Sequence, residues 1–410
     1  MLLDIPYFQN HWLKQIVPIA VVCGMGYLDF AAFYSLGYKE IYLRHSHGVA
    51  ISLWILGGII QFSALVYWLL LFFVGPGKSP RFQALDIYGT DPTLTLVPDY
   101  FVCDKYGFPY YSSNSNSITT NRSFFLKDVG YSVLKFDHYC LWIGNVIGES
   151  NALFFLKFMT CLVIYLAIFL IYLGIYTRSS MSGGREINHN FIVLYVVCGF
   201  WIIMIFALLS VHVMYVSINM TTLDEITQRQ QKVYQRWKQR NQGKNVKKKN
   251  VPRKEDGKRY INVKKDDYRL VVQFDIMDRP YNLGYRTNWI NFIFNGNRSH
   301  ALKKCELSTS RFIQSLIIFI VPFIDIPVFF AAWKSHQHKP QEDGFSEGQM
   351  KLHFYQHYNS EFSEDFKRKI DEKIQSNLCY TALYTLPRDT SPNPPSPNGD
   401  SSSNEQKESP

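Results

Sequence analysis

The stretch GVAISLWILGGIIQFSALVYWLLLFFV, residues 48–74, contains no Asp, Glu, Lys, Arg or His over 27 consecutive positions. An α-helix rises 1.5 Å per residue, so about 20 apolar residues cross the ~30 Å hydrocarbon layer of a membrane. Because backbone groups in hydrocarbon must be hydrogen-bonded within the segment itself, this stretch predicts a transmembrane helix. The fold class then depends on how many such stretches the chain contains.

Three further stretches are long and apolar enough to span a membrane: residues 16–41, 152–176 and 191–216. The stretch 152–176 carries a single charged residue, Lys157. No small-residue cleavage site follows the first stretch, so we expect it to stay in the protein as a helix. The sequence therefore predicts a polytopic α-helical membrane protein with four transmembrane helices.

The basic residues predict which connections face the cytosol. The short connections 42–47 and 177–190 contain three arginines, whereas the loop 76–150 contains six Lys or Arg and the region after residue 216 is far more basic. By the positive-inside rule, the long loop and the C-terminal region are both cytosolic. With four helices, the N-terminus is expected on the same side.

The predicted organisation follows from these assignments. It comprises a cytosolic N-terminus at 1–15, helices one and two within 16–75, a cytosolic loop at 76–150, helices three and four within 151–216, a cytosolic C-terminal region at 217–386, and a disordered tail rich in Ser, Pro and Asn at 387–410. A helix is expected to leave the membrane directly after the fourth span.

A basic run follows that helix. Between Gln228 and Asp267, 15 Lys or Arg stand against 4 acids. Two interpretations stay open, a solvated linker and a segment attracted to anionic lipid. Nucleic-acid binding is not expected, because no folded basic domain surrounds the run.

A further apolar segment, FIQSLIIFIVPFIDIPVFFAAW at 312–333, is interrupted by Pro322, Asp325 and Pro327. A fifth transmembrane helix would place Asp325 near the middle of the bilayer, where a charge is costly. The favoured interpretation is an interfacial or groove-docked segment.

Candidate catalytic residues lie in the long loop, within KFDHYCLWIGNVIGESN at 135–151. Cys140 stands about ten residues before the third span, so its thiol is expected at the membrane surface. A free thiol, with a pKa near ~8.5, is mostly protonated at neutral pH, and a neighbouring imidazole oriented by a carboxylate activates it. Asp137, His138 and Cys140 supply this set, and a turn or helical bend is expected to bring His138 beside Cys140.

The remaining cysteines and intramembrane polar residues have simpler interpretations. The seven cysteines show no regular extracellular spacing, so we expect reduced thiols rather than a disulfide framework. Asp29, Gln61 and His212 lie within predicted spans, where polar side chains either mark function or form helix–helix hydrogen bonds, the second being at least as favoured.

Several motifs together resemble one family, the DHHC-type protein S-acyltransferases, or palmitoyltransferases. The resemblance covers most of the chain, and its motifs occur in the family's order: GPGKSP at 75–80, DHYC followed by WIGNVIGESN at 137–151, TTLDE at 221–225 and RPYNLGYRTNW at 279–289. Tyr139 stands at the third position of the Asp-His-His-Cys signature, and the chain is most similar to a fungal branch with that substitution.

The resemblance implies transfer of palmitate, or another long-chain acyl group, from acyl-CoA to a cysteine of a protein substrate through an S-acyl-cysteine enzyme intermediate. It assigns Cys140 as nucleophile, His138 as base and Asp137 as the carboxylate that orients His138. Palmitoyl-CoA is then a substrate and not a bound cofactor. Arg122 and Lys135 either meet coenzyme A phosphates or are simply solvated.

The same resemblance implies partners and a location. The expected partners are long-chain acyl-CoA, cytosolic or membrane-associated protein substrates and membrane lipid, with no nucleic acid. The expected location is a fungal plasma membrane or endomembrane, with the active site in the cytosol.

The family's loop normally binds two structural zinc ions, but this chain lacks the ligands. The corresponding positions hold Phe125, Leu126, Val129, Ser132, Tyr139 and Val146. Residues 76–150 contain two cysteines and one histidine, whereas a structural zinc needs four ligands. We therefore expect no bound metal and a loop stabilised by apolar packing, as hydrophobic residues replace ionic cores elsewhere. The residues expected in that packing are Phe124, Phe125, Leu126, Val129 and Tyr131.

Two other functions are weighed against the acyltransferase. A catalytically weak membrane scaffold, or an acyl-binding relative of the family, would need none of the three catalytic residues, so their retention favours the enzyme. A small transporter or channel is disfavoured, because paired charges and broken helices in corresponding positions are not seen.

Overall fold

The computed structural model describes residues 11–79, 98–119, 122–182, 186, 188–242, 258–265, 268–294, 308–324 and 362–383. Within these ranges, four helices are long and apolar enough to cross a membrane, over Lys14–Tyr42, His47–Val74, Ala152–Ser182 and His189–Ser217. The prediction of four such helices is confirmed, and each one extends a few residues beyond its apolar centre.

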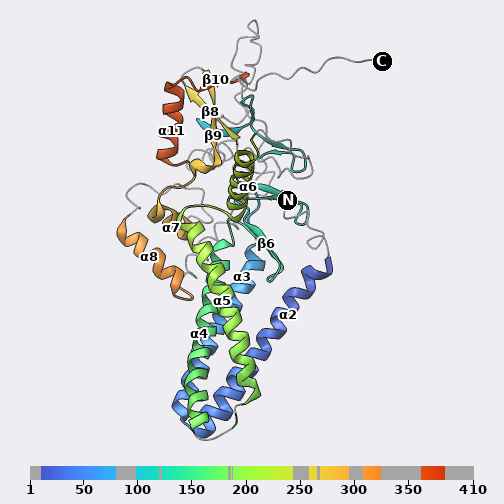
Figure 1. The fold of residues 1–410 in the computed structure, drawn as a ribbon, viewed down its shortest axis with the longest axis vertical. Coiled ribbons are helices and arrows are strands. Elements are labelled where there is room, and N and C mark those ends of the chain that lie inside the picture. Colours follow the sequence, from blue (N-terminus) through green and yellow to red (C-terminus); the bar gives the residue numbers. More distant parts are fainter. Residues whose placement is uncertain are drawn as a thin grey trace.

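The first span changes its winding midway. The α-helix α2 (His11–Asp29) continues as the π-helix η2 (Phe30–Tyr42). The other three spans are the helices α3 (His47–Val74), α4 (Ala152–Ser182) and α5 (His189–Ser217). In Figure 1 the first half of α2 diverges from the other helices, whereas η2 lies against α3.

The helices pack around an apolar core that contains Leu36, Leu53, Phe169 and Leu194 from four different segments. Their outward faces are also apolar, and α5 exposes large side chains such as Ile203. An apolar surface of this extent is the surface that lipid covers.

A polar contact crosses the bundle. Gln61 Nε2 donates a hydrogen bond to Asp29 Oδ2, and the Tyr165 hydroxyl donates one to Asp29 Oδ1. The predicted helix–helix hydrogen bonds of Asp29 and Gln61 are confirmed.

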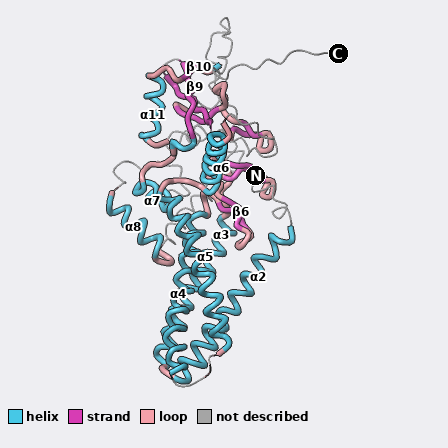
Figure 2. Tube along the Cα trace, viewed as in Figure 1, coloured by secondary structure: helices cyan, strands magenta, loops and turns pink. Residues whose placement is uncertain are grey.

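Short strands gather at one end of the bundle, shown in magenta in Figure 2. In its described parts, 98–119 and 122–150, the long loop contributes three antiparallel hairpins. They are β2 (Tyr111–Ser112) with β3 (Ser117–Ile118), β4 (Phe124–Leu126) with β5 (Tyr131–Val133), and β6 (His138–Cys140) with β7 (Asn145–Ile147).

A four-stranded antiparallel sheet joins the long loop to the C-terminal region. Its strand order is β1 (Tyr100–Cys103), β8 (Lys258–Lys265), β9 (Tyr268–Asp275) and β10 (Cys379–Thr381). Helix α11 (Glu364–Gln375) places Phe366 and Ile370 in the apolar cluster on this sheet. The regions predicted separately as 76–150 and 217–386 therefore share a sheet.

Three helices connect the bundle to this sheet or lie beside the bundle: α6 (Thr222–Arg240), α7 (Tyr285–Phe294) and α8 (Thr309–Ile320). Helix α6 begins directly after α5, so the helix predicted after the fourth span is confirmed. The 3-10 turn η4 (Ile276–Asp278) follows β9.

Helix α8 is too short to cross a membrane, and it docks on the bundle. The buried Lys157 ammonium donates to the carbonyl oxygens of Ile318 at 2.6 Å and Val321 at 3.1 Å, and it lies 5.1 Å from the centre of the Tyr67 ring. Lys157, the single charged residue of the stretch 152–176, thus holds the C-terminal end of α8. This agrees with the groove-docked interpretation for 312–324, while 325–333 and the predicted tail 387–410 lie outside the described residues.

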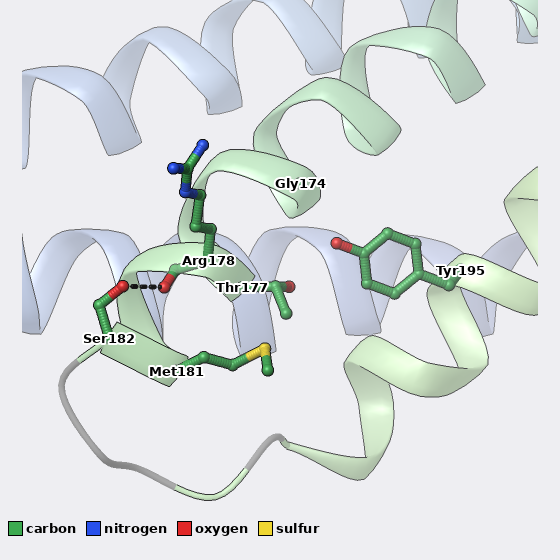
Figure 3. Close-up of a pocket in the computed structure, with 6 residues that line it drawn as sticks. All are labelled: Gly174, Thr177, Arg178, Met181, Ser182 and Tyr195. Atoms are coloured by element: carbon green, nitrogen blue, oxygen red, sulfur yellow. Dashed lines mark hydrogen bonds between the residues drawn. The ribbon is translucent and has the colours of Figure 1, made fainter.

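A cavity of about 530 Å³ lies between the end of α4 and the start of α5 (Figure 3). Arg178, Met181 and Tyr195 are among its lining residues. Cys140, in contrast, precedes the first residue of α4, and α4 has 31 residues. At 1.5 Å per residue, this cavity is about 35–45 Å from the catalytic loop and takes no part in its chemistry.

Candidate active site

The β6–β7 hairpin places the histidine and the cysteine of the motif on one face. His138 pairs with Ile147, Tyr139 with Val146 and Cys140 with Asn145. Alternate residues of a strand point to the same side, so the His-x-Cys spacing aligns the two reactive side chains. The expected turn or helical bend is therefore wrong: an extended strand brings His138 to Cys140.

The turn of this hairpin meets the first helix. Gly144 has φ +78°, and a Cβ built on it would lie 2.8 Å from Pro18 Cγ in α2. Glycine is required here by both its backbone conformation and the close approach. Nearby, the Lys14 ammonium pairs with Asp128 at 2.5 Å and lies 5.0 Å from the centre of the Tyr139 ring.

The three predicted catalytic residues are brought together. His138 Nδ1 lies 2.6 Å from Asp137 Oδ2. Because a carboxylate only accepts hydrogen bonds, Nδ1 carries a proton. The other ring nitrogen, Nε2, is then the one available for proton transfer. Cys140 lies two residues from His138 on the same strand, so its side chain is on the same face as the imidazole. This is the order carboxylate, imidazole, thiol that activates a cysteine nucleophile.

Cys140 lies between the loop and the membrane helices. Only 6% of the residue is exposed, and it belongs to an apolar cluster with Tyr67 and Leu71 of α3 and Phe154 and Met159 of α4. The thiol is therefore next to the apolar interior of the bundle, while His138 and Asp137 connect it to the polar loop.

The start of α6 binds Asp137. The Thr222 backbone N–H donates to Asp137 Oδ1 at 2.6 Å, and the Thr222 hydroxyl donates to Oδ2 at 2.7 Å. Thr221 and Asp224 form a capping box at the same helix end. The N-terminus of a helix favours negative charge. The TTLDE motif forms the N-terminus of α6, which therefore binds the Asp137 carboxylate.

These contacts shift the protonation of the pair. Burial alone would raise the pKa of Asp137, but hydrogen bonds and charges from His138 and His212 hold it well below its usual range. Burial alone would lower the pKa of His138, but Asp137 and Cys140 raise it to about 9. The geometry thus favours an ionised carboxylate beside a protonated imidazole at neutral pH.

A second histidine, His212 of α5, belongs to this site. Its Nε2 lies 3.5 Å from Asp137 Oδ2, and its ring centre is 5.7 Å from that of His138. Of the two interpretations open for His212, a functional role and helix–helix hydrogen bonding, the structure favours the first, because the polar neighbour that is described for it on another segment is the Asp137 carboxylate. The signal was its place near the cytosolic end predicted for the fourth span, at the depth predicted for Cys140.

The three ligand atoms of Asp137, His138 and His212 lie within 4.8 Å of one another, a set that can hold a metal ion. His138 Nδ1 already contacts Asp137 Oδ2, and the Thr222 backbone N–H donates to the other carboxylate oxygen, Oδ1. A structural zinc needs four ligands, which this set does not supply. The arrangement is that of a proton-transfer group.

The positions that would bind structural zinc in the family do not fit the metal. Leu126, Val133, Phe136 and Val146 form a buried apolar cluster, with Val129, Tyr131 and Tyr139 packed against it. Phe124 stacks on Phe136 with ring centres 5.6 Å apart. Four of the expected ligand positions, Leu126, Val129, Tyr139 and Val146, thus lie in or against this cluster and offer no zinc ligand, so no step of the chemistry is assigned to zinc.

Asparagines fasten the hairpin to the bundle. Asn145 Nδ2 donates to Leu71 O at the end of α3 at 2.7 Å, and Asn151 Nδ2 donates to Val146 O at 2.8 Å. From the C-terminal motif, Asn288 Nδ2 donates to Ser217 O at the end of α5 at 2.8 Å. Asparagines of two motifs therefore attach to the ends of α3 and α5.

The two basic residues considered for coenzyme A differ. The buried Arg122 guanidinium donates to Asn219 Oδ1 at 3.0 Å and Asp224 Oδ2 at 2.9 Å, and it lies 4.7 Å from the centre of the Tyr281 ring. It ties the loop to the α5–α6 junction, so the structure does not support solvation, one of the two interpretations left open for Arg122. Lys135 pairs with Glu149 at 2.7 Å and remains partly exposed, so its role stays a prediction.

Comparisons with known proteins agree with these motifs. A profile of the DHHC palmitoyltransferase family matches residues 105–229. The chain is 48% identical over 385 residues to "Palmitoyltransferase PFA5" of Candida albicans, which covers 93% of this chain and 95% of the relative. It is 29% identical to the Candida glabrata protein of the same name over 54% of this chain and 64% of that one. It is also 40% identical over 100 residues to "Palmitoyltransferase ZDHHC15" of Xenopus laevis, or 23% of this chain and 29% of that one.

Proposed function

This chain belongs to the DHHC palmitoyltransferase family and is a protein S-palmitoyltransferase, and from that premise we propose that Cys140 carries the acyl group between the two substrates. The donor is a long-chain acyl-CoA such as palmitoyl-CoA, and the acceptor is a cysteine of a protein. The observation that carries the proposal is the placement of the three residues: His138 Nδ1 lies 2.6 Å from Asp137 Oδ2, and Cys140 is on the same face of β6 as His138.

The first half-reaction forms the acyl-enzyme. The Cys140 thiolate attacks the carbonyl carbon of the acyl-CoA thioester, and a new C–S bond forms at Cys140. The bond from the carbonyl carbon to the coenzyme A sulfur then breaks. The departing thiolate takes a proton from His138, which Asp137 holds in orientation.

The second half-reaction reverses these roles. An acceptor cysteine gives its proton to His138 and attacks the acyl carbonyl carbon, and the bond to Cys140 Sγ breaks. One thioester replaces another, so little driving force is required. The apolar cluster around Cys140 supports this route, because it offers the acyl chain a hydrocarbon surface beside the reacting sulfur.

The topology and location form part of the proposal. The integral membrane chain is oriented with the catalytic loop and C-terminal region in the cytosol, in a fungal plasma membrane or endomembrane. Partners are cytosolic or membrane-associated proteins and membrane lipid. The positive-inside bias of the connections supports the orientation.

A burst experiment separates this enzyme from a scaffold that only binds acyl groups. Purified protein in detergent is mixed with palmitoyl-CoA without acceptor, and free coenzyme A is measured on a millisecond-to-second scale. We expect about one equivalent of coenzyme A per enzyme in a fast phase, followed by slow hydrolysis, because the acyl group remains on the enzyme. Release of no coenzyme A would favour the scaffold, and steady release without a burst would contradict the covalent intermediate.

The pH dependence of acylation should reflect His138. Its pKa is raised to about 9, so the protonated imidazole is present at neutral pH and is lost as the pH rises through that value. We expect the rate of acyl-enzyme formation to fall above about pH 9, because neutral His138 cannot protonate the leaving thiolate. Asp137→Asn keeps the side-chain shape but removes the charge. In this variant, the pH at which the acylation rate falls should move toward the ordinary histidine pKa, about 6.5.

Acyl-CoA blanks at each pH correct for uncatalysed hydrolysis. Coincident profiles for the wild type and Asp137→Asn would show that Asp137 does not control the protonation of His138.

The metal-free loop gives a stability prediction. Incubation with a strong chelator should leave both melting temperature and acylation unchanged. Phe136→Ala should lower the free energy of unfolding of the loop by about 3–5 kcal/mol, because it empties the centre of the apolar cluster. The control Tyr111→Ala removes an exposed aromatic side chain of the same loop. A melting temperature that falls with chelator would contradict apolar packing as the replacement for zinc.

A further inference from the structure

The two ring nitrogens of His212 both face acceptors. Nδ1 lies 2.9 Å from the Leu208 carbonyl oxygen, one turn earlier in α5. Nε2 faces Asp137 Oδ2 at 3.5 Å and has no hydrogen-bond partner among the described residues. The residue is only 7% exposed, so water does not readily satisfy the second nitrogen.

The acceptors decide which protons the ring carries. A carbonyl oxygen cannot donate, so Nδ1 must carry a hydrogen. A neutral ring would then point the Nε2 lone pair at a carboxylate oxygen, which leaves a buried polar atom unsatisfied beside a negative charge. A doubly protonated ring donates at both nitrogens, and a small closing of the 3.5 Å gap completes the second hydrogen bond.

The groups around His212 are consistent with a positive ring. The loop supplies Asp137 and His138, and α5 itself supplies Tyr215, whose ring centre is 5.8 Å away. Helix α4 supplies the apolar Phe155, whose ring makes a T-shaped contact with each histidine ring, at 5.4 Å from His138 and 5.3 Å from His212 between ring centres. Oδ2 of Asp137 therefore faces both imidazoles and the Thr222 hydroxyl, whereas Oδ1 accepts from the Thr222 backbone N–H.

We propose that His212 is a positioning residue, whose protonated ring donates from Nε2 to Asp137 and holds this carboxylate in the orientation that binds His138. The inference rests on the proposed roles of Asp137, His138 and Cys140. With a cation at His212, the set of carboxylate, two imidazolium rings and thiolate is electrically neutral as a whole. No bond to substrate is made by His212.

Three variants test the role. His212→Leu removes both donors at similar volume, and His212→Gln retains a neutral amide donor that can reach Asp137. His189→Leu is the matched control, because it makes the same change at the exposed start of the same helix. The first readout is the rate of acyl-enzyme formation as a function of palmitoyl-CoA concentration.

We expect His212→Leu to lower the maximal rate about tenfold, the effect of losing one hydrogen bond to a charged group, with KM for palmitoyl-CoA unchanged. His212→Gln should recover at least a third of the wild-type rate. His189→Leu should match the wild type.

The second readout does not need acyl transfer. Alkylation of Cys140 by iodoacetamide is followed at the Cys140 peptide by mass spectrometry across pH. His212→Leu should move the pH midpoint upward by about one unit, because the thiolate loses both a nearby positive charge and a well-oriented His138. Melting curves of the same samples report folding.

The outcomes distinguish a failure of the role proposed for His212 from a failure of the proposed function. If His212→Leu changes neither the maximal rate nor the alkylation midpoint, the positioning role is overturned. This holds even if the melting temperature of the variant falls. A wild type that forms no acyl-enzyme would overturn the proposed function instead, while the alkylation midpoint would still test whether His212 acts on the Asp137–His138–Cys140 set.

Discussion

Cys140→Ser is expected to abolish acyl-enzyme formation, with a loss of at least about 10⁴-fold in rate. Serine has nearly the same shape, but its hydroxyl stays protonated beside an imidazole adapted to a thiol, so the nucleophile is lost while the β6–β7 hairpin is kept. The measurement is labelled palmitate that survives denaturation and is released by neutral hydroxylamine, which cleaves thioesters.

The matched control is Cys161→Ser. Cys161 is 2% exposed and belongs to the same apolar cluster as Cys140, but it lies on α4 and away from the β6–β7 hairpin. Labelling per folded enzyme should be retained in this variant. Equal thioester label on Cys140→Ser and the wild type would place the acyl group on another cysteine and remove the nucleophile from the proposed site.

His138→Ala is expected to have the second largest effect, a decrease of about 10²–10⁴-fold in the rate of acyl-enzyme formation. The substitution removes both the base that receives the Cys140 proton and the acid that protonates coenzyme A. It also leaves the Asp137 carboxylate without its hydrogen bond from Nδ1.

The double variant Asp137→Asn with His138→Ala sharpens this prediction. If Asp137 acts through His138, the double variant should be no slower than His138→Ala alone, because residues that act as a unit are non-additive. Independent, multiplying effects would show that Asp137 has a separate role. A His138→Ala enzyme within threefold of the wild type would remove the general base from the mechanism.

The helices and the reactive set could be predicted from the sequence because both are local. Residues 48–74 are apolar throughout, so their identity as a span does not depend on the rest of the fold. Asp137, His138 and Cys140 lie within four consecutive positions, and their spacing already places His138 and Cys140 on one side of a strand. Only the backbone conformation was predicted wrongly, as a bend.

Contacts between distant segments could not be predicted in this way. Phe101 pairs with Asn262 across 161 positions in the sheet, and no periodicity in either segment selects that partner. His212 and Thr222 reach Asp137 only because α5 ends where the loop returns to the bundle. For Arg122 the sequence leaves coenzyme A phosphates and solvent as the two open partners, whereas its acceptors, Asn219 and Asp224, are about 100 positions away.

The central claim is that the acyl group passes through Cys140, and the most direct measurement is a chase of the isolated acyl-enzyme. The wild type is loaded with labelled palmitate, freed of acyl-CoA by gel filtration, and mixed with an acceptor protein or a cysteine peptide in detergent. Intact mass spectrometry then follows the acyl mass on both partners. The account predicts that the enzyme loses one acyl mass, located at Cys140, as the acceptor gains it, at a rate at least equal to steady-state turnover. An acyl-enzyme that stays loaded while turnover with fresh palmitoyl-CoA proceeds would contradict it.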